Sequence, residues 1–220
     1  MGSITRSLSN NITTGGVILP AGITNSSVSA VTAFSGYTTG GTLKLLSTQT
    51  ASSSANLSFT TGLDSTYDEY IFKFINVRPA TDQVPFMFNL STNGGSTYAV
   101  TKTTSIFRAY HQEDDSVTAL EYYGSYDLAQ STAYQAIFWS VGNASDESCS
   151  GTLTLFNPSS TTYVKHYIFS GNEYEGTNYT INGYVAGYGN TTSAINAIDF
   201  KFNSGNIADG IIKMYGVKKS

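Results

Sequence analysis

Two glutamates are the first residues in this sequence that could carry out chemistry. Glu173 and Glu175 are separated by one residue, so on a β-strand both side chains point to the same face. A pair of carboxylates is what a glycoside hydrolase uses as its acid and its base or nucleophile. That chemistry also needs a cleft and a raised pKa on one partner, and the sequence shows neither. A glycosidase is therefore the function that we favour least.

The other candidate reactive groups give weaker signals. Cys149 is the single cysteine, and no sequence pattern brings His111 or His166, the two histidines, beside it as a base. We expect Cys149 to be a buried or half-exposed structural residue. The run Glu113–Asp115 offers three carboxylates of the kind that bind Ca²⁺, but its spacing does not match a calcium loop. We favour an exposed acidic hairpin turn there, and we expect no metal site, no cofactor and no catalytic residue.

Aromatic side chains are more prominent than reactive ones, at 13% of the chain with 16 tyrosines. Tyrosine and tryptophan combine a flat apolar face with a polar tip, which suits both sugar stacking and protein interfaces. Alternating strands would nevertheless bury many of them in an ordinary core. We therefore favour a core or subunit-interface role over a glycan-contacting surface. The residues concerned are Tyr122, Tyr123, Tyr126, Tyr134, Trp139, Tyr174 and Tyr179.

Composition disfavours several classes of protein. Only 12% of the 220 residues are charged, the net charge is −4, and no basic cluster is larger than Lys218-Lys219. Neutralising nucleic-acid phosphates needs several lysines or arginines, so we expect no nucleic-acid partner. No apolar run is long enough for a membrane-spanning helix, and we expect no membrane insertion. The first residues lack the apolar segment of a signal peptide, which favours synthesis in a reducing cytoplasm without export.

Short segments of alternating apolar and polar residues recur from Leu43 onward. In one of them Ile198 and Phe200 lie on one face of the strand, with Asp199 and Lys201 on the opposite, solvated face. The predicted strands are Leu43–Leu46, Leu57–Thr61, Tyr70–Ile75, Phe86–Leu90, Tyr98–Thr101, Ser105–His111, Val117–Tyr123, Gln135–Val141, Thr152–Phe156, Tyr163–Phe169, Tyr179–Tyr188, Ile195–Phe202 and Ile211–Val217.

These strands predict an all-β fold. No helical stretch is long enough for a crossover between parallel strands, so the sheets should be antiparallel. We expect a single β-sandwich or jelly-roll-like domain over residues 43–220, because no linker and no repeat of fixed period divides that segment.

The first 42 residues differ from the rest and predict an extended N-terminal arm. They carry one charge, Arg6, and consist of short apolar islands separated by Gly, Ser, Thr and Asn. Such a segment cannot build a core of its own, yet it is too apolar for a solvated linker. We favour an arm that becomes ordered on another chain over a flexible leader. Its predicted anchoring residues are Ile12, Val17, Ile18, Leu19 and Pro20.

Three stretches resemble the β-rich accessory virion structural proteins of marine tailed bacteriophages. They are Asp64–Asn76, which begins DSTYDEY, Phe156–His166, and Phe202–Val217, which contains SGNIADGIIKMYG. The resemblance covers most of residues 43–217 as a pattern and brings no catalytic residues with it. It implies an all-β head-decoration, head-fibre or tail component.

Together these observations predict a non-enzymatic virion structural protein, made in the host cytoplasm and located in the virion. Residues 1–42 would anchor it to capsid or tail subunits while the β domain is displayed outward. We expect a homo-oligomer with closed, three-fold symmetry. The alternative is a host-receptor or carbohydrate-binding module of a tail fibre, whose aromatic surface would contact a host surface glycan.

Overall fold

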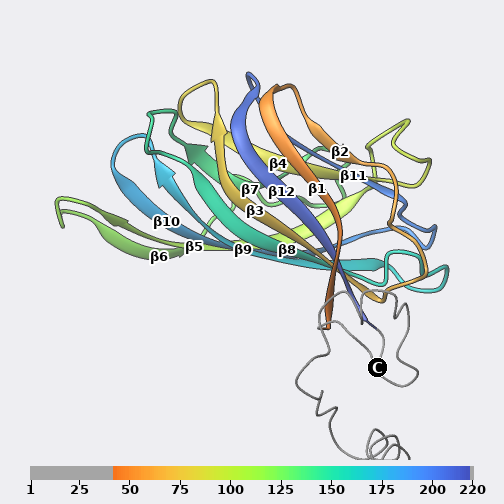
Figure 1. Ribbon diagram of the computed structural model, residues 1–220. Helices are drawn as coiled ribbons and strands as arrows, with labels where there is room; N and C mark the ends of the chain where they lie inside the picture. Colours follow the sequence, from red (N-terminus) through yellow and green to blue (C-terminus); the bar gives the residue numbers. More distant parts are fainter. Residues whose placement is uncertain (1–41, 219–220) are drawn as a thin grey trace, which may run out of the picture. The chain divides into compact units, whose positions relative to one another are not determined.

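The computed structural model describes residues 42–218, and every regular element among them is a β-strand (Figure 1). No helix in this part of the chain is long and apolar enough to cross a membrane. The strands are β1 (Leu43–Ser54), β2 (Leu57–Phe59), β3 (Glu69–Pro79), β4 (Val84–Ser91), β5 (Lys102–Gln112), β6 (Thr118–Tyr122), β7 (Gln135–Val141), β8 (Cys149–Phe156), β9 (Lys165–Glu175), β10 (Tyr179–Gly189), β11 (Ala197–Phe202) and β12 (Ile207–Val217).

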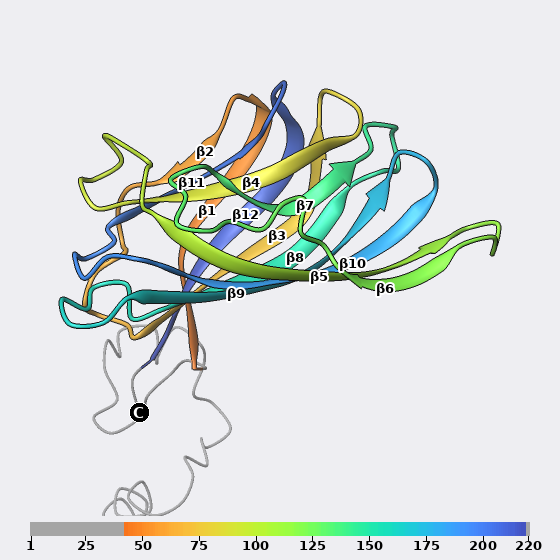
Figure 2. The same cartoon turned by 180° about the vertical axis from the view of Figure 1, so that it is seen from behind.

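The strands pair in two antiparallel ladders. Eight of them form one ladder in the order β1-β12-β3-β8-β9-β10-β5-β6, and the remaining four form the order β7-β4-β11-β2. A single residue pair, Val141 with Glu175, joins β7 to β9 and makes the ladders one continuous sheet. That sheet curls back on itself until it is nearly closed, while the β5–β6 hairpin extends beyond the other strands (Figures 1 and 2).

An aromatic cluster holds the two ladders together. Its centre is Phe74 on β3, whose ring centroid lies 5.1 Å from that of Phe200 and 5.7 Å from that of Phe86. The rings of Phe138 and Phe169 lie 6.3 and 6.2 Å from Phe74. Phe74 and Phe169 belong to the eight-stranded ladder and the other three to the four-stranded ladder, so burial of these rings stabilises the contact between ladders.

The predicted all-β, antiparallel class is confirmed. All twelve strands overlap predicted segments, but Tyr98–Thr101 is not a strand. Side chains satisfy its carbonyl groups in place of a ladder, because Asn89 Nδ2 donates to Tyr98 O at 2.7 Å and Lys102 Nζ to Val100 O at 2.8 Å. The predicted arm, apart from Thr42, lies outside the described residues.

Asp199 corrects the predicted solvated face of β11, since only 1% of it is exposed. Its carboxylate accepts hydrogen bonds from Asn56 Nδ2 and Ser58 Oγ beside β2, and from the Tyr134 hydroxyl at 3.0 Å. The Lys201 Nζ lies 4.3 Å from the Tyr134 ring centroid. Asn56 before β2, Ser58 on β2 and Tyr134 before β7 therefore cover this face, which strand periodicity alone did not indicate.

Gly183 on β10 lets β7 approach the eight-stranded ladder closely. A Cβ at this position would lie 2.1 Å from the indole ring of Trp139, which is 2% exposed. Trp139 in turn packs edge-to-face against Tyr123, with ring centroids 5.6 Å apart. The missing side chain at Gly183 thus fixes where this aromatic pair can sit.

The substitution Gly183→Ala should therefore destabilise the domain, because the added methyl group forces Trp139 or β10 to move. We expect the free energy of unfolding, measured with urea, to fall by about 1–3 kcal/mol. The control Gly124→Ala places a Cβ no closer than 3.6 Å to other atoms and should change stability little. Equal stabilities of the two variants would contradict the close packing of Trp139 on Gly183.

Candidate functional site

The structure separates the predicted aromatic residues into two groups. Tyr123, Tyr126 and Trp139 form one cluster, with the Tyr123 ring centroid 5.4 Å from that of Tyr126. Trp139 is buried within it and presents no surface to a sugar. Tyr122 is 60% exposed on the opposite face of β6, and its hydroxyl donates to Asp127 Oδ2 at 2.6 Å. Tyr174 also lies away from the cluster, with its hydroxyl donating to Asn178 Oδ1 at 3.2 Å.

The cluster borders a groove on the inner face of the eight-stranded ladder. We call it the inner groove, and its volume is about 310 Å³. Alternation along β5 places Arg108 and Tyr110 on this face. Tyr179 and Ile181 on β10 lie on the same face, because Ile181 pairs directly with Tyr110. The residues lining the inner groove are Arg108, Tyr110, Tyr123, Ser140, Glu175, Thr177, Tyr179 and Ile181.

Arg108 is the cation of the inner groove and is held in one orientation. Its Nε donates to Glu121 Oε1 at 2.8 Å, and its Nη2 lies 2.8 Å from the same oxygen. The guanidinium carbon lies 3.6 Å from the Tyr123 ring centroid and 5.0 Å from that of Tyr110. An ion pair and two cation–π contacts together fix this planar group.

Glu175 is the carboxylate of the inner groove, and it is also fixed. Its Oε1 accepts a hydrogen bond from Ser140 Oγ at 2.9 Å, and its Oε2 accepts one from the Thr177 backbone N–H at 2.7 Å. The Thr177 hydroxyl donates to Oε2 as well. The carboxylate is thus positioned by its neighbours before any ligand arrives.

Glu173 shares the face of β9 with Glu175, as the sequence predicts, but it is fully buried. Its carboxyl oxygens accept hydrogen bonds from the backbone N–H groups of Trp139, at 2.8 Å, and Ser140, at 3.3 Å. Burial raises the pKa of Glu173 to about 8 despite these two bonds. Only Glu175 is positioned to touch a ligand, so the two carboxylates do not face one cleft as a glycosidase pair would.

The outer face of the same ladder gathers the exposed apolar side chains. We define it by two rows of cross-strand partners: Leu45–Tyr215–Ile71–Thr154–Ile168–Ala186–Ser105 and Thr48–Lys213–Lys73–Thr152–Ser170–Tyr184–Phe107–Tyr122. Directly opposed residues share a face, and the rows are two residues apart on β9. The charged residues in these rows are Lys73 and Lys213, so the outer face is poor in charge.

Large apolar side chains on this outer face are well exposed. Ile168 is 52% exposed, and the stacked rings of Phe107 and Tyr184 have centroids 4.8 Å apart. Small residues beside them, including Ala186, leave a hollow of about 530 Å³. The described residues include ten large exposed hydrophobic side chains, and eight of them point to the outer face: Leu43, Leu45, Ile75, Phe107, Leu120, Tyr122, Ile168 and Tyr184. Such a concentration is typical of interaction surfaces.

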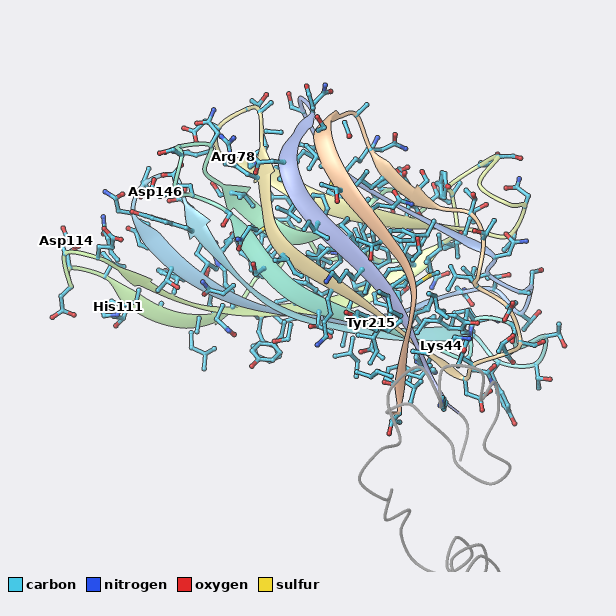
Figure 3. The ribbon with its side chains drawn as sticks, viewed as in Figure 1. Lys44, Arg78, His111, Asp114, Asp146 and Tyr215 are labelled. Atoms are coloured by element: carbon cyan, nitrogen blue, oxygen red, sulfur yellow. The ribbon has the colours of Figure 1, made fainter. Side chains whose placement is uncertain are left out.

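The remaining predicted residues occupy structural or peripheral places. Cys149 is buried, as expected, with its thiol 3.2 Å from Val77 O, and burial raises the pKa of this thiol. The run Glu113–Asp115 is an exposed turn at the tip of the β5–β6 hairpin, near the labelled His111 and Asp114 in Figure 3. No cluster of metal-ligating side chains occurs within residues 42–218. The predicted anchoring residues, Ile12 and Val17–Pro20, lie outside the described residues.

Sequence reasoning missed Arg108 and Tyr110 as members of a site. The available signal was their alternation on one strand, Arg-x-Tyr, but the significance of this spacing depends on which strands pair with β5. Cross-strand pairing with Glu121 and Ile181 is a long-range property, which a single sequence does not display.

Comparison with known proteins does not identify the chain. No protein-family model, curated protein or solved structure matches it. The resemblance to bacteriophage virion proteins therefore stays a prediction from local motifs, and the inner groove and outer face are characterised by their geometry.

The raised pKa of Glu173 predicts how stability depends on pH. In the folded protein the Glu173 carboxyl group keeps its proton up to about pH 8, whereas in the unfolded chain it releases the proton above its ordinary pKa of 4.5. The stability that this bound proton contributes is therefore complete below pH 4.5 and is lost as the pH rises through about 8. Between pH 5 and 7, the wild-type free energy of unfolding should fall by about 1 kcal/mol per pH unit relative to that of Glu173→Gln. Gln keeps an acceptor for Trp139 and Ser140 but cannot ionise.

Urea unfolding at pH 5, 6 and 7 measures this difference. Burial lowers the pKa of Lys102 to about 7. This amine has the opposite effect on stability, because its contribution grows as the pH rises above 7. Measurements between pH 5 and 7 therefore contain little of the Lys102 effect. The control Glu113→Gln removes an exposed carboxylate and should retain the wild-type pH dependence. Parallel wild-type and Glu173→Gln profiles would contradict a protonated, buried Glu173.

Proposed function

We propose that this chain is a non-enzymatic structural protein of a tailed-bacteriophage virion, a head decoration, fibre or tail component. Residues 1–42 attach it to neighbouring capsid or tail subunits, and the β domain is displayed. The observation that carries the proposal is the outer face, where eight large apolar side chains lie exposed on one ladder. A surface of this kind suits permanent assembly better than free existence in water.

The domain architecture that goes with this proposal is a jelly-roll-like sandwich. The eight-stranded and four-stranded ladders would be its two layers, with the Phe74 cluster as the core between them. Sandwiches of this kind need no active-site residues to function as repeated building units. The burial of Glu173 and Cys149 is consistent with a non-enzymatic role.

The occupant that we propose for the outer face is a second copy of this chain. The acidic tip Glu113–Asp115 lies at the β5–β6 end of the eight-stranded ladder, while Lys73 and Lys213 lie on strands toward the opposite end. Opposite charges at the two ends favour head-to-tail packing, in which the acidic tip of one copy meets the lysines of the next. Head-to-tail contacts close into rings when the rotation permits, and we propose a three-fold ring.

Substitution on the outer face should weaken this self-association. Ile168→Glu places a carboxylate among apolar side chains at the predicted interface, so we expect a tenfold or greater rise in the dissociation constant, of order 1.4 kcal/mol. Sedimentation equilibrium of the full chain measures it. The control Ser96→Glu adds the same charge to an exposed loop. A monomeric wild type, or equal association of wild type and Ile168→Glu, would contradict the interface.

Removal of residues 1–22 should separate folding from attachment. We expect a folded β domain with an unchanged circular-dichroism spectrum that no longer incorporates into particles, because the apolar segment Val17–Pro20 is lost. A full-length variant with Val17, Ile18 and Leu19 replaced by Ser tests the same contact at constant length. Incorporation is measured by quantitative mass spectrometry of purified particles. Normal incorporation of both variants would overturn the proposed anchor.

A further inference from the structure

The inner groove has the composition of a ligand site and is not needed for the proposed assembly. It lies on the opposite side of the eight-stranded ladder from the outer face, since its residues alternate with the outer-face residues along β5 and β10. A ligand could therefore bind there while a second copy covers the outer face.

We propose that the inner groove binds a neutral saccharide, with Tyr179 and Tyr110 as its apolar walls and Arg108 and Glu175 as its hydrogen-bonding groups. The rings of Tyr110 and Tyr179 meet edge-to-face, with centroids 5.9 Å apart, and both are partly exposed. Such a corner of two rings offers apolar surface to the C–H face of a sugar while leaving both hydroxyls free to hydrogen-bond.

The groove also presents a hydrogen-bond acceptor and a hydrogen-bond donor beside these rings. Glu175 is an acceptor fixed by Ser140 and Thr177, and Arg108 is a donor fixed by Glu121. Arg108 Nη1, unlike Nε and Nη2, makes no hydrogen bond to the described residues. A polyhydroxylated ligand can donate to the carboxylate and accept from the guanidinium at once, and fixed partners reduce the entropy lost on binding.

The hydroxyl groups of the groove tyrosines also point to a polar ligand. Within residues 42–218, the hydroxyls of Tyr110, Tyr123 and Tyr179 make no hydrogen bond to protein atoms, whereas those of Tyr122 and Tyr174 each do. None of the three is among the buried side-chain atoms that lack a partner, so each hydroxyl reaches solvent and is accessible to a ligand. Sugar hydroxyls would provide partners for several of them together.

Charge balance excludes an anionic ligand. Arg108 is matched by Glu121, and Glu175 adds a further negative charge, so the groove is not positive overall. Phosphate, sulfate or a sialic acid would face an unmatched carboxylate. A quaternary ammonium ligand is also disfavoured, because it would bring a second positive charge close to the Arg108 guanidinium. A neutral ligand remains.

The size of the groove limits the ligand to a short one. A volume of about 310 Å³ lies at the low end of the usual range for ligand sites and suits one or two sugar rings. The groove lies between β5, β9 and β10 beyond the end of β7, so Ser140 near that end closes one side. A glycan terminus or a short branch would fit better than the middle of a long chain.

Screening the full-length protein on an array of neutral, sialylated and sulfated glycans tests the inference, followed by calorimetric titration of the strongest neutral glycan. Tyr179→Ala and Glu175→Gln should each weaken binding at least tenfold. Tyr163→Ala is the matched control, because Tyr163 is 70% exposed and belongs to neither the inner groove nor the outer face, and it should bind like the wild type.

Circular dichroism and thermal unfolding of each variant separate loss of binding from loss of fold. The inference is overturned if no neutral glycan binds above background, if only sialylated or sulfated glycans bind, or if Tyr163→Ala and not Tyr179→Ala abolishes binding. Glu175→Gln keeps the volume of the side chain, so it remains informative if Tyr179→Ala unfolds. None of these outcomes depends on incorporation into particles or on self-association.

Discussion

The contact of Phe74 with the opposing ladder is the interaction on which the rest of the structure depends. The two ladders share one hydrogen-bonded residue pair, between Val141 and Glu175, so the backbone alone hardly connects them. Four phenylalanine rings packed around Phe74 supply the connection by burial of apolar surface. Cysteine plays no part in this, since Cys149 is a buried free thiol. Few charges take part, in agreement with a sequence that is 12% charged.

The unequal lengths of the two ladders create both surfaces of interest. Four strands cannot cover eight, and the β5–β6 hairpin extends beyond the other strands (Figure 2). Arg108 on β5 and Glu175 on β9 line the inner groove on the inner face of the larger ladder. The opposite face of the eight-stranded ladder has no covering strand, yet it carries Ile168 on β9 and Phe107 on β5 in place of charged residues. In our proposals, one face binds a small polar ligand and the other face binds a protein partner.

The sequence predicted the fold class and most strands because alternation is local and strong, as in Ile198–Phe202. It also placed Glu173 and Glu175 on one face, but it could not show that Glu173 is fully buried while Glu175, at 8% exposed, lines a groove. That difference depends on where β7 ends relative to β9, which is a long-range contact. Likewise, the burial of Trp139 depends on Gly183, a residue 44 positions away whose missing Cβ has no local signature. The pairing of strands, and not the alternation of residues along one strand, decides which tyrosine side chains contact one another.

The central claim is that this chain is a fixed structural component of a bacteriophage particle. Cryo-electron microscopy of purified particles from the phage that encodes it tests that claim most directly. The account predicts repeated density into which residues 42–218 fit as one rigid domain, with the inner groove facing solvent and the preceding segment running into a neighbouring subunit. Particles that contain no such density, and no copies of the chain by mass spectrometry, would contradict it.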